Sequence, residues 1–142
     1  MINTAKELAT RNHGTRRRGS FSYEIDHVSA VANMAKRAGE SNDVITVCWL
    51  HDLKEDCGVS DADLQKAGFS STIISAVDAI TKKTGQTYFD YITKCVALNK
   101  IATLVKLYDL THNMSDLQEG SMKDKYRFAF DYLIKVLEGH IQ

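Results

Sequence analysis

The segment CWLHDLKED (residues 48–56) constrains the fold more than any other part of the 142-residue sequence. It closes an apolar run, which predicts a buried helix whose end carries His51, Asp52, Glu55 and Asp56. Residues three and four apart lie on one face of a helix, so the three carboxylates crowd together. Their desolvation and mutual repulsion cost free energy unless a cation or strong hydrogen-bond donors offset them. The sequence therefore leaves two interpretations: a metal site with His51 as a ready ligand, or a helix end whose acids face solvent.

The rest of the chain favours an all-α fold, because proline is absent and apolar residues follow helical spacing nearly throughout. No linker or internal repeat divides the sequence, so residues 1–142 are predicted to form a single domain. We expect a compact bundle of about seven or eight helices, near residues 4–12, 23–36, 43–54, 61–67, 70–81, 88–97, 100–114 and 123–139.

Charge and cysteine content narrow the functional classes. Lysine plus arginine and aspartate plus glutamate number 18 each, so no overall field attracts nucleic acid or a membrane surface. The three cysteines form no C-x-x-C pair, which favours reduced thiols in a cytoplasmic protein over a disulfide framework or a cysteine zinc site. There is neither a signal-peptide pattern nor an apolar run of about 20 residues.

Basic residues gather near the N-terminus, where Arg11, Arg16, Arg17 and Arg18 lie within eight positions. Such a cluster is typical of a solvated surface, of a nucleic-acid contact or of a phosphate-binding wall. The zero net charge and the lack of a base-reading element argue against nucleic acid.

Two further positions are candidates for a site. His27 lies near the start of the second expected helix, where helix capping or a satisfied core contact explains a histidine as well as metal binding does. Asp109 shares a helical face with apolar residues, so it needs either a buried salt bridge to a lysine or arginine or a functional role. Asn113 lies one turn beyond it, and we expect the neighbouring His112 to be structural or to support a ligand.

His27, the pair His51-Asp52, and Asp109 follow the order H…HD…D. This order resembles the signature of the HD-domain superfamily of metal-dependent phosphohydrolases. HDLKED (residues 51–56) matches the HDxxED motif of its (p)ppGpp hydrolase branch, and VKLYDLTHNM (residues 105–114) is similar to the segment KLADRLHNM. His13, Gly14 and the arginines after them resemble the stretch HxGQxRKSG with differences. The resemblance covers about residues 5–117 and is closest to single-domain alarmone hydrolases.

The resemblance implies a role for each matching residue. One divalent ion is expected on four ligands, namely His27, His51, Asp52 and Asp109. Manganese is usual in this branch, although two imidazoles and two carboxylates also suit Zn²⁺ or Fe²⁺. Glu55 and Asp56 match the catalytic acidic pair, which positions or deprotonates the attacking water and protonates the leaving oxygen. Asn113 matches a residue that contacts ribose or phosphate, and Arg16 and Arg17 match a pair that binds base and phosphate.

The expected reaction is removal of the 3′-pyrophosphate of (p)ppGpp, giving GDP or GTP. Residues 19–27, GSFSYEIDH, weaken this substrate assignment, because they lack the proline of the branch's GxPYxxH and are longer after the glycine. Another nucleotide phosphatase of the HD type, acting on 5′-deoxynucleotides or on the 2′-phosphate of NADPH, is the alternative, and the adjacent Glu55-Asp56 pair argues against a deoxynucleotidase. A non-catalytic nucleotide-binding domain is a third possibility, opposed by the retention of every ligand. In each case the expected partner is a small-molecule nucleotide.

Overall fold

The computed structural model describes residues 1–18, 22–116 and 120–139. Within these ranges the chain is α-helical, and its β-structure is limited to an isolated bridge between Arg17 and Tyr23. The all-α class predicted from the sequence is confirmed. In chain order the elements are α1 (Ile2–His13), α2 (Glu24–Arg37), α3 (Asn42–Leu50), α4 (Leu53–Cys57), α5 (Asp61–Lys66), α6 (Ser71–Ile80), α7 (Tyr88–Lys94), the short 3₁₀-helix η1 (Val96–Leu98), α8 (Lys100–Asp116) and α9 (Ser121–Leu137).

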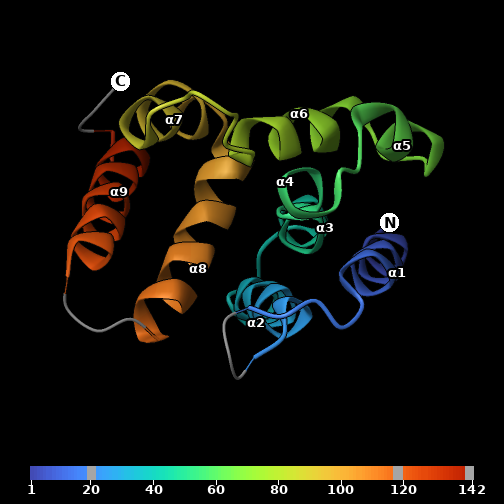
Figure 1. Cartoon of the computed structure of the whole chain (residues 1–142). Helices are drawn as coiled ribbons and strands as arrows, with labels where there is room; N and C mark the ends of the chain where they lie inside the picture. Colours follow the sequence, from blue (N-terminus) through green and yellow to red (C-terminus); the bar gives the residue numbers. More distant parts are fainter. Residues whose placement is uncertain (19–21, 117–119, 140–142) are drawn as a thin grey trace.

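Helix α3 lies at the centre of the fold, between α1 and α8 (Figure 1). Ser41 starts it, because its hydroxyl accepts a hydrogen bond from the backbone N–H of Val44 at 3.3 Å. Every residue from Val44 to Leu50 is buried, and α3 packs against α1, α2, α6 and α8. A helix that is apolar on all sides is stable only when other elements surround it.

The helix expected over residues 43–54 is divided in two, because α3 ends at Leu50 and α4 begins at Leu53. In an unbroken α-helix the carbonyl of Cys48 would accept from the N–H of Asp52. Here the ring Nδ1 of His51 lies 2.6 Å from that carbonyl oxygen and competes for it. The turn between α3 and α4 lets His51 and Asp52 face each other, which neighbouring residues of a regular helix do not do.

Helix α8 completes the frame of the site. It packs against α2, α3, α6 and α9, and α9 also contacts α7 (Figure 1). The expected helix over residues 88–97 is shorter than predicted, because α7 ends at Lys94 and η1 turns the chain into α8. This turn brings the tyrosines of α7 towards the polar face of α8, where Tyr91 meets Lys106.

None of the helices in the described part of the chain has the length and hydropathy needed to cross a bilayer. The longest, α8 and α9, have 17 residues each and carry several charged side chains. Two features of the sequence comparison lie outside the described residues. These are positions 19–21, the start of the segment that departs from GxPYxxH, and position 117, the end of the resemblance.

Leu50 tests the central role of α3. Its side chain is fully buried, so Leu50→Ala is expected to lower the free energy of unfolding by about 2–5 kcal/mol. Leu98 is 75% exposed, so Leu98→Ala should change the free energy of unfolding by less than about 0.5 kcal/mol. Urea denaturation followed by circular dichroism measures both. Equal, small effects would show that α3 is not the centre of the core.

Candidate metal centre

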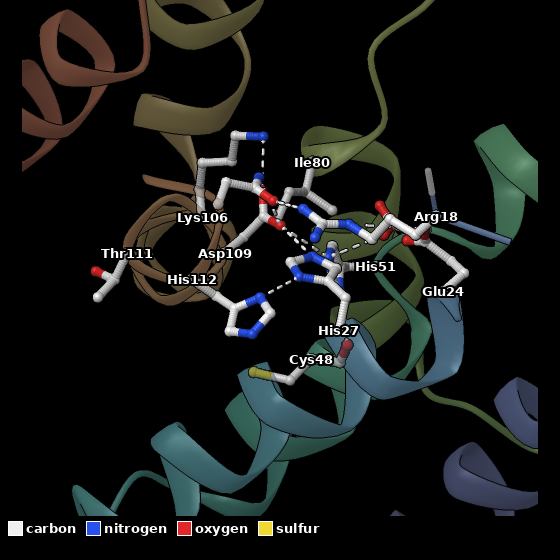
Figure 2. A network of polar contacts seen from close by, with 12 residues as sticks. Arg18, Glu24, His27, Cys48, His51, Ile80, Lys106, Asp109, Thr111 and His112 are labelled. Carbon is white, nitrogen blue, oxygen red and sulfur yellow. Dashed lines mark hydrogen bonds and ion pairs between the residues drawn. The ribbon is translucent and has the colours of Figure 1, made fainter. Parts of the chain in front are cut away.

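Three distant parts of the chain bring the predicted ligands together, and Figure 2 labels three of these ligands, His27, His51 and Asp109. His27 comes from α2, His51 and Asp52 from the turn between α3 and α4, and Asp109 from α8. Asp109 Oδ1 lies 2.8 Å from His27 Nε2 and 3.3 Å from His51 Nε2. Asp52 Oδ2 lies 3.3 Å from the same nitrogen of His51. The two histidines and Asp109 are buried, and Asp52 is half-buried.

The ring of His51 is oriented by the backbone. A carbonyl oxygen can only accept a hydrogen bond, so the ring Nδ1 that lies 2.6 Å from the carbonyl of Cys48 must carry a proton. The opposite nitrogen, Nε2, is then the one that faces Asp52 and Asp109. A histidine that ligates a metal typically donates its other N–H in this way.

His27 is held by a second histidine. Its Nδ1 lies 2.7 Å from Nδ1 of His112 on α8, so one of the two nitrogens donates and the other accepts. The contact leaves Nε2 of His27 directed at Asp109 (Figure 2). His112 therefore stands directly behind a predicted ligand.

Asp109 makes the buried salt bridge that the sequence offered as one explanation, and it also faces two of the predicted ligands. Its Oδ2 accepts a hydrogen bond from Lys106 Nζ at 2.9 Å, which is a buried salt bridge. Its Oδ1 faces the two imidazoles, and Asn113 Nδ2 lies 3.4 Å from it. Burial alone would raise the pKa of Asp109, but Lys106 and the hydrogen bonds from the histidines hold it well below its usual range. The carboxylate is therefore ionised at neutral pH.

The cluster has the donor chemistry of a divalent metal site. One potential ligand atom from each of His27, His51 and Asp52 lies within 4.8 Å of the others. Imidazole nitrogens combined with carboxylate oxygens suit Mn²⁺, Fe²⁺ and Zn²⁺. Burial raises the pKa of Asp52, and the charge of Asp109 raises it further although His51 opposes the shift, so a cation between these groups would relieve a strained arrangement.

A second acidic group adjoins the first and shares Asp52. Oxygens of Glu24, Asp52 and Asp56 also lie within 4.8 Å of one another. Burial, together with a hydrogen bond to Asp52 and its negative charge, raises the pKa of Glu24 to about 7. Glu24 is not among the site residues predicted from the sequence. Its position three residues before His27, on the same face of α2, was the signal that could have found it.

A pocket of about 280 Å³ opens beside the cluster. Glu55 lines it together with Asn113, and burial, followed by the nearby charge of Asp56, raises the pKa of Glu55. Tyrosines and cations form much of the remaining wall, and of these only Arg18, a member of the N-terminal basic cluster, was considered as a site residue from the sequence. The tyrosines are Tyr88, Tyr91 and Tyr126, and the cations are Arg18, Lys82, Lys106 and Lys125.

The three consecutive arginines have different environments. Arg16 donates to the backbone carbonyl of Asp56 at 2.9 Å, and its guanidinium lies 3.8 Å from the Asp56 carboxylate. Arg17 lies over the ring of Tyr23, 4.5 Å from its centroid. Only Arg18 of the three is among the described residues that line the pocket, where it donates to Asn113 Oδ1 and lies 3.8 Å from Glu24.

Proton release on metal binding tests the state of His51. Burial opposes its protonation, but Asp52 and Asp109 raise the pKa of His51 from 6.5 to about 10, so the metal-free ring carries a proton on Nε2 at neutral pH. A metal must displace this proton, so the apparent affinity of the protein for the metal should rise about tenfold for each unit that the pH increases, up to about pH 10. Calorimetry with Mn²⁺ at pH 7.5, in buffers of different ionisation enthalpy, should show about one proton released. Binding without proton release would exclude a charged His51.

In the comparisons with known proteins, no family model matches the chain and no curated protein matches it. Among solved structures, the chain is similar to one described as a metazoan ortholog of SpoT that hydrolyzes ppGpp and plays a role in starvation responses. The TM-score is 0.78 at 21% sequence identity, and the alignment covers 99% of this chain and 86% of that one. The similarity establishes the fold: the chain has the all-α architecture expected from its resemblance to the HD-domain superfamily.

Proposed function

We propose that the protein is a metal-dependent phosphohydrolase that removes the 3′-pyrophosphate of (p)ppGpp, giving GDP or GTP. The carrying observation is the contact of His27, His51, Asp52 and Asp109 beside a pocket lined by an acid and by cations. The similar solved structure supports the proposal, because that protein is described as hydrolysing ppGpp.

We propose that His27, His51, Asp52 and Asp109 hold one divalent ion, Mn²⁺ by preference. When bound, such an ion supplies Lewis acidity and lowers the pKa of a coordinated water. Hydrogen bonds orient three of the proposed ligands. The carbonyl of Cys48 orients His51, and His112 orients His27. Lys106 orients Asp109.

Glu55 and Asp56 would act on protons. Glu55 lines the pocket, and its raised pKa suits a group that takes a proton from water and returns it to the leaving oxygen. Asp56 does not line the pocket but lies against Glu24 and Asp52, where Arg16 holds it from the other side. We therefore propose Glu55 as the residue that exchanges the proton and Asp56 as its electrostatic partner.

The substrate would lie across the pocket between the acidic cluster and the cations. Its phosphates carry several negative charges, which Arg18, Lys82 and Lys125 on the pocket wall can neutralise. Asn113 lies between Asp109 and Arg18, where it can contact ribose or phosphate. We further propose a cytoplasmic single-domain enzyme over residues 1–142, acting in an alarmone (stringent) response with a small-molecule nucleotide as its partner.

Hydrolysis of ppGpp is the primary test. The protein is incubated with Mn²⁺ and ppGpp, and the products are resolved by anion exchange. The expected products are GDP and pyrophosphate. Intact ppGpp would exclude the substrate but not the metal centre, and the same assay would then turn to NADPH and deoxynucleoside monophosphates.

Asp52→Ala and Glu55→Ala separate metal binding from proton transfer. Asp52→Ala is expected to lose both bound metal and turnover. Glu55→Ala should keep its metal while kcat falls by about 10²–10⁴-fold, the range typical of general acid–base catalysis. Glu7→Ala, at an exposed position of α1, is the matched control and should behave as wild type. Full metal occupancy in Asp52→Ala would contradict the ligand assignment, and metal loss in Glu55→Ala would make Glu55 a ligand.

The three arginines should separate in steady-state kinetics. The resemblance assigns substrate binding to Arg16 and Arg17, whereas the pocket lining favours Arg18. Loss of a charge-assisted hydrogen bond to substrate raises KM by about tenfold or more with a smaller effect on kcat. We expect this for Arg18→Ala. A larger KM effect in Arg17→Ala than in Arg18→Ala would instead place Arg17 on the substrate.

A further inference from the structure

Lys106 brings a half-buried ammonium group into the pocket. Its side chain is 12% exposed, and Nζ lies 2.9 Å from Asp109 Oδ2 and 5.4 Å from the ring centroid of Tyr91. An ammonium group has three hydrogen-bond donors. Within the described part of the chain, Asp109 is the one hydrogen-bond acceptor that it reaches. The remaining donors are therefore available to a ligand with acceptor oxygens in the pocket that Lys106 lines.

Tyr88 adds a second donor to the same pocket. Its hydroxyl oxygen is buried and, among the described residues, has no hydrogen-bond partner. The ring is fixed from two sides, because it lies 5.8 Å from the ring of Tyr91 and Lys125 Nζ lies 4.3 Å from its centroid. Tyr91 contacts both Tyr88 and Lys106, so the unpaired hydroxyl and the ammonium group belong to one wall.

The chemistry of this wall selects a class of ligand. It offers donors and positive charge, with Lys82 and Lys125 also lining the pocket. A group with several acceptor oxygens and negative charge satisfies both requirements, and phosphate and pyrophosphate are such groups. A cation would be repelled by the lysines, and an apolar group would leave the donors unpaired.

We propose that Lys106 and Tyr88 together bind oxygens of a phosphate or pyrophosphate group beside the metal centre. This proposal rests on the proposed function in one respect, namely the identity of the nucleotide that carries the phosphate or pyrophosphate group. In this arrangement Lys106 has two roles. One of its N–H groups donates to Asp109, and the other two donate to oxygens of the anion. Among the described residues the Tyr88 hydroxyl makes no hydrogen bond to a predicted metal ligand, so Tyr88→Phe removes no hydrogen bond that holds the metal site.

Binding of inorganic pyrophosphate tests the proposal without any turnover. Protein loaded with Mn²⁺ is freed of excess metal and titrated calorimetrically, and its metal content is measured again afterwards. Tyr88→Phe removes the hydroxyl and keeps the ring, so the Kd for pyrophosphate should rise about tenfold or more with Mn²⁺ retained. Tyr132→Phe, on α9 outside the pocket lining, is the matched control and should bind pyrophosphate as wild type does. A Kd for Tyr88→Phe within twofold of wild type would overturn the proposal.

Lys106→Met gives a second measurement. With Mn²⁺ retained, its affinity for pyrophosphate should fall at least as far as in Tyr88→Phe, whereas unchanged affinity would remove Lys106 from the site. If Lys106→Met loses its metal, the Tyr88→Phe result alone decides. Failure of the proposed function is a different outcome: pyrophosphate binding that depends on Tyr88 in a protein inactive on ppGpp would retain the anion site and exclude the substrate. If the wild-type protein hydrolyses ppGpp but Tyr88→Phe binds pyrophosphate normally, the proposed function stands and the anion site is excluded.

Discussion

The buried carboxylate of Asp109 is the group on which the rest of the site depends. An ionised carboxylate inside an apolar core is unfavourable unless it is paired and hydrogen-bonded. Its partners come from three places: Lys106 from α8 itself, His27 from α2, and His51 from the turn after α3. The packing of α2, α3 and α8 and the assembly of the candidate metal centre are therefore one arrangement. Removing any one of these partners would leave the buried charge of Asp109 less fully compensated.

The sequence predicted the parts of the structure that follow from periodicity. It indicated an all-α fold, a buried helix over about residues 43–54 that carries His51 near its end, and an Asp109 that needed a partner, because apolar spacing shows which face of a helix is buried. It did not predict the break between α3 and α4, which depends on a side chain competing for the carbonyl of Cys48. The placement of Arg18 and Tyr88 depends on contacts between helices far apart in the chain, which no local pattern encodes. Lys106 was accessible to sequence reasoning, since it lies three residues before Asp109 on one helical face.

The pocket is lined by groups of opposite charge. Carboxylates and an imidazole line it together with lysines and tyrosines, and Lys106 contacts both Asp109 and Tyr91. A cation bound by the carboxylates and imidazoles and an anion bound by the lysines would attract each other across a short distance. Each would then increase the affinity for the other by the same factor, because coupling between two binding equilibria is reciprocal.

The turn between α3 and α4 means that the position of His51 depends on the number of residues in α3. Ser41 sets where the helix begins, and the ring of His51 sets where it ends. Every residue from Val44 to Leu50 is buried, so the helix cannot rotate to absorb a change in length. Inserting or deleting one residue within it would turn His51 by about 100° around the helix axis. A change in the number of residues in this helix would therefore displace a predicted ligand, whereas a change of one side chain leaves the position of His51 along the helix unaltered.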